Sequence, residues 1–375
     1  MSVYWNEKTR NLKPYVPGEQ PKDRKFIKLN TNENPYPPSP KVIEAIQKAA
    51  AETLRLYPDP ACAELREAAA ARYGLNAKQV FAGNGSDEIL AFAFAAFYGN
   101  EKPILFPDIT YSFYPVYAEL WGMPYKTIPL TEDFSIDINP YLEMIAQGKT
   151  SGIIFSNPNA PTGMALSFDE VKKIAEAAKK KNQVLVVDEA YIAFTESESP
   201  SQKNLAPQAC LGTALSLIND FPNILIVRTF SKEASLAGLR VGFALGSEEL
   251  IEGLFRIHDS FNSYTMDRLA LAGAKAALED ASYYDEINRR IIATRLRLSQ
   301  KLKALGFKVL PSQANFIFAS PPRKSGTEFF ASLRERGILV RHFNKPRIAG
   351  FLRITIGTDE EMDTLLNACE EIIRE

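Results

Sequence analysis

The 375-residue sequence predicts an α/β fold: a large domain with a mostly parallel sheet flanked by helices, plus a smaller α+β domain. Between residues 75 and 265, short apolar runs alternate with amphipathic helical segments, as in parallel sheets that helices cover on both faces. Beyond residue 265, a long helical stretch precedes short strands and a final helix, which is typical of an α+β unit. The length also exceeds what one hydrophobic core usually serves, so two domains are expected.

The domain division follows these changes in pattern. We expect an N-terminal arm over residues 1–38 that joins the small domain, a large domain over 39–265, and a small C-terminal domain over 266–375. The arm is rich in Pro, Asn and Lys and is predicted to be extended. Ser39, with a proline directly after it, is a good N-cap for a helix over about 40–53.

The other elements are predicted from apolar runs and from end signals. A second helix over 62–73 stops at Gly74, a residue that favours helix C-termini. Ser167 and Glu170 form a capping box that opens another helix. The strands of the large domain are expected near 80–82, 104–106, 153–155, 184–187, 224–227 and 241–245. In the small domain we expect helical structure from about 267 to 305, strands near 315–319, 338–341 and 352–356, and a terminal helix from about 359.

Composition excludes several classes of partner. The formal net charge is −1, so no overall field favours nucleic acid or an anionic membrane. No apolar run approaches membrane-spanning length, and the first residues lack the apolar stretch of a signal peptide. Three scattered cysteines, Cys62, Cys210 and Cys369, suit a reducing compartment, so we expect a cytoplasmic protein. The two histidines, His258 and His342, show no metal-ligand spacing, and no metal is expected.

Lys232 is the most informative candidate residue. It follows the apolar run 224–227, where a desolvated amine near another cation can lose its proton and attack a carbonyl. Ser231 and Arg240 supply a hydroxyl and a guanidinium, the groups that hold a phosphate. An amine nucleophile beside a phosphate site is what pyridoxal phosphate requires. The alternative is a surface loop with two ordinary basic residues.

Asp188 supports the first interpretation. It ends the apolar run 184–187, and the carboxyl ends of strands line the ligand crevice of open α/β sheets. A carboxylate there can pair with the protonated pyridine nitrogen and keep the ring an electron sink. Tyr191, three residues further on, can bond the phenolic oxygen of the ring. The alternatives for Asp188 are a helix cap or a metal ligand, and the scarcity of histidine disfavours the metal.

With these residues in place, the chain resembles the fold-type I pyridoxal-phosphate-dependent aminotransferases, in the class-II-like group that contains the histidinol-phosphate aminotransferases. The resemblance covers nearly the whole length, and it depends on the joint order and spacing of its motifs. These motifs are residues 10–15, 29–35, 56–58, 83–88, 111, 157–163, 188–191, 231–232, 240 and 352–355.

The segment after strand 80–82 is expected to complete the cofactor's phosphate site. Gly85, Ser86 and Asp87 open a helix whose free N–H groups can meet a phosphate. The third glycine of a dinucleotide-binding motif is missing, so the sequence disfavours a dinucleotide site here. The resemblance further implies that Tyr57 of the partner subunit reaches this phosphate, which makes a homodimer part of the site, and that Tyr111 stacks on the pyridine ring.

One loop departs from the family pattern. Family members usually carry Asn directly before Pro-Thr-Gly, bonding the phenolic oxygen of the cofactor, and here that position is Ala160. Either Asn157 or Asn159 supplies the amide, or Tyr191 acts alone. We favour Asn157, because it comes directly off the strand end.

Substrate contacts are implied mainly by the resemblance. Arg353 lies in an apolar strand and normally needs a partner there. The family pattern implies that it binds the α-carboxylate of glutamate in one half-reaction and the phosphate of histidinol phosphate in the other, with Arg341 assisting. Tyr15, Asn32 and Glu33 of the arm would frame the rest of the pocket.

The predicted activity is therefore a pyridoxal 5'-phosphate-dependent transamination between histidinol phosphate and 2-oxoglutarate, a step of histidine biosynthesis. Lys232 would hold the cofactor and move a proton as general base and acid, while Asp188 and Tyr191 support the ring. Two alternatives share these residues: a threonine-phosphate decarboxylase and an aromatic amino acid aminotransferase. A cofactor-binding sensor domain of a regulator is a third, disfavoured because the arm has no helix-turn-helix pattern.

Overall fold

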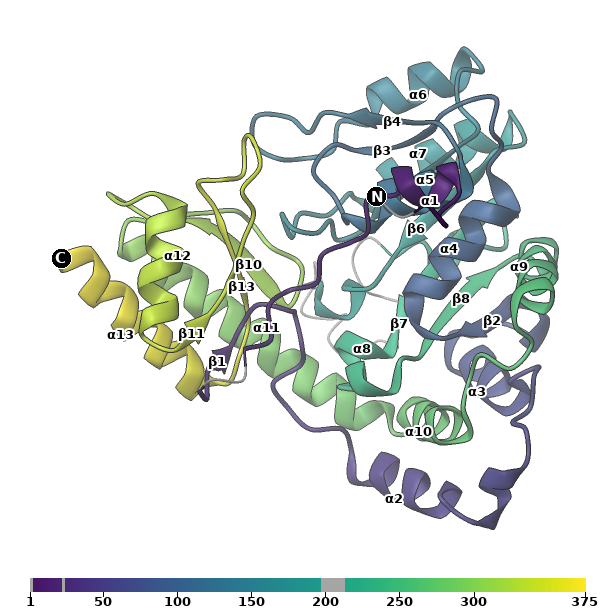
Figure 1. The fold of residues 1–375 in the computed structure, drawn as a ribbon, viewed down its shortest axis with the longest axis horizontal. Coiled ribbons are helices and arrows are strands. Elements are labelled where there is room, and N and C mark those ends of the chain that lie inside the picture. The colour runs from purple at the N-terminus through teal and green to yellow at the C-terminus, as the bar shows by residue number, and fades with distance from the viewer. Residues whose placement is uncertain (1–2, 22–23, 197–212) are drawn as a thin grey trace.

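The computed structural model describes residues 3–21, 24–196 and 213–375. Two separate sheets organise the larger and the smaller lobe of the molecule (Figure 1). The seven-stranded sheet has the order β2-β8-β7-β6-β5-β3-β4 and the four-stranded sheet the order β12-β13-β10-β9. The strands of the first are β2 Val80–Gly83, β3 Ile104–Pro107, β4 Tyr125–Ile128, β5 Gly152–Ser156, β6 Val184–Asp188, β7 Ile224–Thr229 and β8 Gly242–Gly246. Those of the second are β9 Lys308–Val309, β10 Phe316–Ser320, β12 Arg341–His342 and β13 Leu352–Thr355.

The large sheet is mostly parallel, and helices cover both of its faces. Strands β3 to β7 pair in parallel, and β8 runs antiparallel between β7 and β2. One apolar cluster packs the sheet against α4, α5 and α9, and another packs it against α3, α6, α7 and α10. These helices are α3 Ala63–Tyr73, α4 Gly85–Phe97, α5 Phe113–Trp121, α6 Asn139–Ala146, α7 Phe168–Lys179, α9 Glu248–Phe261 and α10 Arg268–Glu279. Burial on both faces explains why the central strands are continuous apolar runs.

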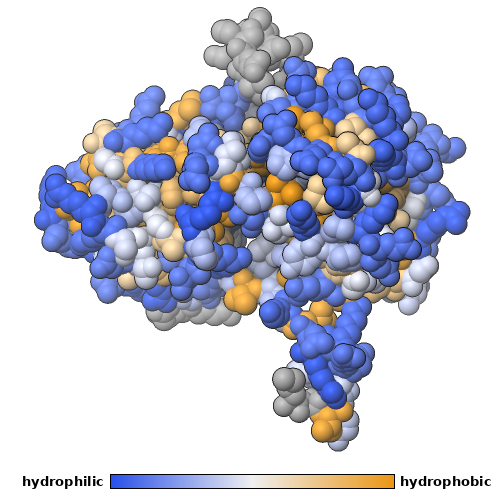
Figure 2. All heavy atoms as spheres, turned by 90° about the horizontal axis from the view of Figure 1, so that it is seen from above, coloured by the Kyte–Doolittle hydropathy of each residue, from blue (hydrophilic) through white to orange (hydrophobic). Residues whose placement is uncertain are grey.

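The smaller lobe packs three helices, α11 Ala281–Ala304, α12 Gly326–Glu335 and α13 Asp359–Arg374, around its sheet. The N-terminal segment reaches this lobe, because β1 (Ile27–Lys28) pairs in parallel with β11 (Ile338–Leu339). Before β1 the chain forms the short helix α1 (Glu7–Asn11), and the N-terminal end makes a narrow projection from the body in Figure 2. The proposed division into an arm and two domains remains a prediction.

The helical stretch expected over 267–305 is two helices. Asp280 leaves the helical region with φ −108° and ψ 42°, so α10 ends before it and α11 begins after it. Its carboxylate accepts a hydrogen bond from Lys41 Nζ at 2.7 Å. Lys41 belongs to α2 (Pro40–Ala49), against which α10 packs. The bend therefore turns α10 toward the large lobe while α11 continues into the smaller one.

The end signals read from the sequence are mostly confirmed. The Ser39 hydroxyl accepts the Val42 N–H, although α2 stops at residue 49 and a short 3-10 helix follows at Glu52–Arg55. Gly74 ends α3 in the left-handed conformation, and the capping box opens α7. Strand β4 was not predicted, because the first three residues of this edge strand are exposed and form no apolar run.

Two of the three cysteines lie in the described part of the chain. Cys62 and Cys369 are buried and free, while Cys210 lies outside the described part of the chain. No group of three or more His, Cys, Asp or Glu side chains within the described ranges is arranged to hold a metal ion. None of the helices described is both long enough and apolar enough to cross a bilayer.

A buried ion pair joins the ends of β6 and β7. Arg228 Nη2 lies 2.8 Å from Glu189 Oε2, and both side chains are almost inaccessible, at 3% and 0%. The carboxylate also accepts hydrogen bonds from the Thr213 hydroxyl at 3.0 Å and the Ala214 N–H at 2.7 Å. Every oxygen of Glu189 is thus engaged, which is the condition under which a buried charge is tolerated.

Removing one partner of this pair should be costly. Arg228→Ala leaves the Glu189 carboxylate buried without its cation and is expected to lower the free energy of unfolding by about 3–5 kcal/mol. Denaturant unfolding measures the difference. Arg256→Ala is the matched control, because that arginine pairs with Glu252 on the surface and its side chain is 78% exposed. Equal losses in the two variants would contradict a stabilising role for the buried pair.

Candidate active site

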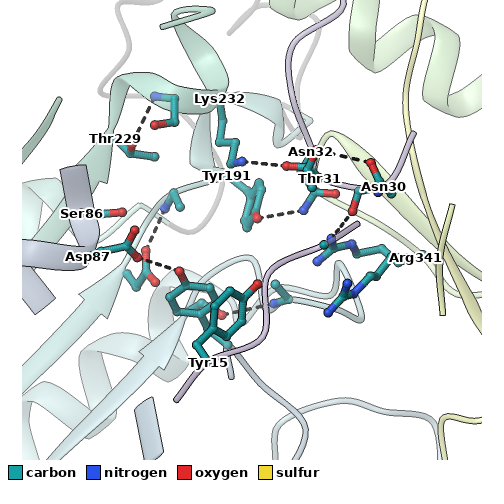
Figure 3. A pocket seen from close by; sticks show the side chains of 18 of the residues that line it. Tyr15, Asn30, Thr31, Asn32, Ser86, Asp87, Tyr191, Thr229, Lys232 and Arg341 are labelled. Atoms are coloured by element: carbon teal, nitrogen blue, oxygen red, sulfur yellow. Dashed lines mark hydrogen bonds between the residues drawn. The ribbon is translucent and has the colours of Figure 1, made fainter. Parts of the chain in front are cut away.

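A pocket opens at the carboxyl ends of β5, β6 and β7, where the segment after β1 and the β12–β13 hairpin close over the large sheet (Figure 3). Twelve of the residues predicted from the sequence line it: Tyr15, Asn32, Ser86, Asp87, Tyr111, Asp188, Tyr191, Ser231, Lys232, Arg240, Arg341 and Arg353. Ser86 and Asp87 lie on one side of the pocket and Arg341 on the other, with Lys232 and Tyr191 between them. The pocket therefore has two separate ends, one at Ser86 and Asp87 and the other at Arg341.

Lys232 lies in α8 (Phe230–Glu233), the short helix that begins where β7 ends. The Thr229 hydroxyl accepts the Ser231 N–H at 3.1 Å and so starts this turn. Lys232 Nζ donates to the Thr31 carbonyl at 3.0 Å. Burial, helped by the charge of Arg353, lowers the pKa of Lys232 to about 8. A sizeable fraction of the amine is therefore neutral and nucleophilic near neutral pH.

Asp188 ends β6 and is 4% exposed. Its Oδ2 accepts the hydroxyl of Tyr114 at 3.0 Å and its Oδ1 accepts the Ala190 N–H at 3.2 Å. Burial raises the pKa of Asp188 to about 7, against an ordinary value of 3.8. Tyr114 was not among the site residues predicted from the sequence. It lies three residues after Tyr111, but Tyr111 precedes α5, so helical spacing gave no signal for Tyr114.

The raised pKa of Asp188 predicts a pH effect on stability without cofactor. Between about pH 4 and about pH 7 the folded protein keeps a proton that the unfolded chain has lost, so this group lowers stability progressively as pH rises through that window. Asp188→Asn removes the titration. Thermal unfolding of the cofactor-free proteins should show the melting temperature of the variant rising relative to that of the wild type between these pH values, and Asp220→Asn, which replaces an exposed aspartate, is the control. A difference independent of pH would contradict the assignment.

The N-terminus of α4 forms one anion-binding end. The Asn84 side chain makes no capping hydrogen bond, so the first N–H groups of the helix stay available. Gly85 has φ +77°, and a Cβ there would lie 2.7 Å from the Arg240 guanidinium. Arg240 donates to Asp87 Oδ2 at 2.9 Å and reaches the hydroxyl of Ser231 at 3.5 Å. A glycine is thus required for the arginine and the helix end to converge.

Aromatic rings form a wall of the pocket. Tyr111 donates to Asp87 Oδ1 at 2.7 Å, which ties the ring to the same acidic residue as Arg240. Tyr15, from the N-terminal segment, stacks on Phe113 with ring centroids 4.2 Å apart. The two tyrosines therefore flank the space between Asp188 and the arginines of the smaller lobe.

The second anion-binding end consists of two arginines of the β12–β13 hairpin. Arg353 Nη2 donates to the Asn30 carbonyl at 2.9 Å, while its buried Nε has no hydrogen-bond partner among the described residues. Within the described part of the chain, Arg341 donates hydrogen bonds only to the carbonyls of Pro17 and Val16, at 3.5 and 3.4 Å. Guanidinium N–H groups with unused capacity, facing a pocket, suit a carboxylate or a phosphate.

Asn32 lines the pocket and also fixes the position of Tyr191. Its side chain donates to the Tyr191 hydroxyl at 2.9 Å, and its own oxygen accepts the Thr355 hydroxyl at 3.1 Å. Asn32 adopts φ +57°, the left-handed region that asparagine tolerates better than most residues. Glu33 does not line the pocket and instead pairs with Lys28, at 2.6 Å.

The loop between β5 and α7 brings neither predicted amide into the pocket. Asn157 Oδ1 accepts the Leu166 N–H at 2.8 Å, so its side chain points back into its own loop. Asn159 bonds the Ile109 carbonyl at 2.9 Å and the Thr110 hydroxyl at 2.8 Å. Ala160 does line the pocket. Among the three alternatives raised for the phenolic oxygen, this arrangement favours Tyr191 acting alone.

Tyr57 lies outside this pocket. Its side chain is 78% exposed, its ring lies 4.6 Å from that of Tyr264, and its carbonyl accepts a hydrogen bond from Arg268. The contact predicted for it involves a second subunit.

Known proteins match this chain over almost its entire length. The family model for class I and II aminotransferases matches residues 24–369. A histidinol-phosphate aminotransferase of Clostridium acetobutylicum is 51% identical over 373 residues, covering 100% of both chains. A histidinol-phosphate aminotransferase 1 of Bordetella parapertussis is 53% identical, covering 99% of each.

Solved structures match it as well. The histidinol-phosphate aminotransferase of Sinorhizobium meliloti, whose crystal structure contains pyridoxal-5'-phosphate, superposes with a TM-score of 0.86 at 27% identity, over 100% of this chain and 98% of that one. The fold-type I architecture expected from the sequence is thereby confirmed. Together with the partly buried lysine and the carboxylate at the end of β6, these matches lead to one conclusion: the chain belongs to the class I and II aminotransferase family.

Proposed function

We propose that this chain is a pyridoxal 5'-phosphate-dependent aminotransferase that exchanges the amino group of histidinol phosphate with 2-oxoglutarate, a step of histidine biosynthesis. One observation carries the proposal: the partly buried amine of Lys232, with its lowered pKa, lies between the Asp188 carboxylate and two separate ends of the pocket that suit anions. The relatives at 51% and 53% identity support the choice of substrate.

The residues fit the cofactor. The open N-terminus of α4, with Ser231 and Arg240, suits its phosphate, and the space that a Cβ at Gly85 would fill is required for that arrangement. Asp188, buried and with one side facing the pocket, suits a protonated ring nitrogen. When bound, the cofactor supplies an electron sink that stabilises negative charge at the substrate's Cα.

Residues of the chain would then bind the cofactor and transfer the proton. Lys232 would hold the cofactor at rest and would afterwards use its Nζ to move a proton from Cα of the substrate to C4′ of the cofactor, which requires the neutral amine that its lowered pKa favours. Asp188 keeps a negative charge beside the ring nitrogen. Tyr191, held by Asn32, offers its hydroxyl to the phenolic oxygen of the ring. Burial of these groups excludes water from the proton transfer.

The arginines should separate the two substrates. Arg353→Ala is expected to raise KM for both glutamate and histidinol phosphate by about 10- to 100-fold, because each charge-assisted hydrogen bond is worth about 1.5–3 kcal/mol. Arg341→Ala should raise KM mainly for the phosphorylated substrate. Steady-state kinetics with each substrate measures the split, and the exposed Arg290→Ala serves as control. Equal effects of Arg341→Ala on both substrates would contradict phosphate binding by this residue.

We further propose a homodimer in which Tyr57 of the partner subunit completes each phosphate site. An exposed apolar group supports this assembly, since monomers rarely leave such groups uncovered. It consists of Leu54, Leu56, Tyr57, Phe261 and Tyr264, which are 53%, 50%, 78%, 70% and 46% exposed. The free thiols of Cys62 and Cys369 support a reducing compartment, and we propose the cytoplasm.

A substrate comparison tests the proposed function. The cofactor-loaded protein is given 2-oxoglutarate together with histidinol phosphate, phenylalanine or threonine phosphate, and glutamate formation is followed. We expect the highest kcat/KM with histidinol phosphate. Preference for phenylalanine would instead identify an aromatic amino acid aminotransferase. Release of carbon dioxide from threonine phosphate without 2-oxoglutarate would identify a decarboxylase.

A further inference from the structure

Tyr114 does not line the pocket, but its side chain contacts the Asp188 carboxylate. Its side chain is fully buried, and its hydroxyl donates to Asp188 Oδ2 at 3.0 Å. Burial, together with the nearby charge of Asp188, raises the pKa of Tyr114 well above its ordinary value, so this hydroxyl stays protonated and remains a donor. Ser156 of β5, the register partner of Asp188, also lies close to the Tyr114 hydroxyl.

The Tyr114 ring has little freedom to move. It meets Phe106 edge-on with centroids 5.8 Å apart and Tyr111 edge-on at 5.7 Å. These contacts come from β3 and from the segment just before α5, so the hydroxyl is directed toward β6 by packing on the large sheet. A donor held in this way fixes the rotation of the carboxylate that it bonds.

The two oxygens of Asp188 have different neighbours. Oδ2 accepts the Tyr114 hydroxyl, and Oδ1 accepts the Ala190 N–H at 3.2 Å. Donors to a carboxylate favour its charged form, and they oppose the effect of burial, which raises the pKa of Asp188 to about 7. Without the tyrosine hydroxyl, Asp188 would lose one of these two donors and would be neutral over more of the physiological pH range.

We propose that Tyr114 is a positioning residue, whose hydroxyl orients the Asp188 carboxylate and keeps it ionised, so that Asp188 can pair with the protonated ring nitrogen of pyridoxal phosphate. The inference rests on the proposed function, since it assigns the partner of Asp188. Tyr114 itself does not line the pocket and acts only through Asp188. An effect of Tyr114 on affinity is therefore expected only for a ligand that carries the ring nitrogen.

Binding of two cofactors tests this role. Dissociation constants are measured by equilibrium dialysis for pyridoxal phosphate and for its deaza analogue, in which a C–H replaces the ring nitrogen. Tyr114→Phe keeps the ring and removes the hydroxyl. It should weaken pyridoxal phosphate binding by about tenfold, the value of one hydrogen bond to a charged group, and leave binding of the analogue unchanged. The loss should also grow as pH falls toward the pKa of Asp188.

Tyr141→Phe is the matched control. Tyr141 is likewise buried, at 1% exposure, lies in α6 away from the pocket, and its hydroxyl has no hydrogen-bond partner among the described residues. Binding of both cofactors should be unchanged in this variant. A double-mutant cycle adds a second measurement: in the Asp188→Asn background, removing the Tyr114 hydroxyl should have no further effect on pyridoxal phosphate affinity.

The outcomes separate the two proposals. Equal weakening of both cofactors by Tyr114→Phe, no weakening of either, or a full effect in the Asp188→Asn background would overturn the positioning role and leave the proposed function intact. If the wild type failed to bind pyridoxal phosphate, the proposed function would fall, and this inference with it.

Discussion

Lys232→Ala is expected to lose transamination by about 10⁴-fold or more, because one group both holds the cofactor and transfers the proton. Among the described residues that line the pocket, Lys232 carries the one amine. The variant should still fold, since Lys232 makes one side-chain hydrogen bond, to the Thr31 carbonyl. Single-turnover assays with glutamate measure the loss directly.

The control for Lys232 is Lys48→Ala. Lys48 lies on α2 and is 75% exposed, with a single ion pair to Glu44. Its removal should leave kcat and KM unchanged, which shows that loss of a lysine charge alone has no effect. Transamination retained in Lys232→Ala at more than a few per cent of the wild-type rate would reject the central role of this amine.

Asp188→Ala should be the second most damaging change, lowering kcat by about 10²–10³-fold. Removing one group that stabilises charge in a preorganised site without water typically lowers kcat by about this factor. The Asp188 side chain is such a group, because it is 4% exposed and lies at the end of β6. KM for the amino donor should change less, because the anion-binding arginines are untouched. Steady-state kinetics at saturating cofactor separates the two effects.

Two further variants make the Asp188 result specific. Asp188→Asn keeps the shape and should behave nearly as badly as alanine, since charge rather than bulk is required. Asp220→Ala removes an exposed carboxylate and should have no effect on kcat. Near-normal rates in Asp188→Asn would mean that another group is the partner of the ring nitrogen.

The sequence predicted the large sheet well because its inner strands are buried on both faces. Runs such as Ile224–Val227 stay apolar throughout and cannot be confused with surface loops. Residues near the ends of these strands were equally predictable: Asp188 follows such a run directly, Lys232 comes five residues after another, and the topology brings strand ends together. Edge strand β4 lacked this signal, as its first three residues are exposed.

Side-chain partners from distant segments could not be predicted in the same way. Lys232 bonds the carbonyl of Thr31, about 200 residues away in the chain, and backbone carbonyls carry no sequence signal. The direction of an amide is equally hidden: Asn157 was favoured as a pocket residue for its place at a strand end, yet its side chain bonds Leu166. Such contacts depend on how a loop folds back, which single residues do not encode.

The break at Asp280 illustrates a third limit. Leu, Ala and Arg continue through residues 267–305 with good helix propensity, and one aspartate is a weak stop signal. Tertiary contacts decide the outcome, since Lys41 bonds Asp280 and α10 packs against α2. The bend matters because it joins the two lobes on either side of the pocket.

The most direct test is to locate the cofactor on the chain. The protein is loaded with pyridoxal phosphate, treated with borohydride, which fixes a pyridoxal group to the lysine that holds it, and then digested for mass spectrometry. We predict one label per chain, on the peptide that contains Lys232, and loss of the label after prior treatment with glutamate. A label on any other lysine, or none after loading, would contradict the proposed active site.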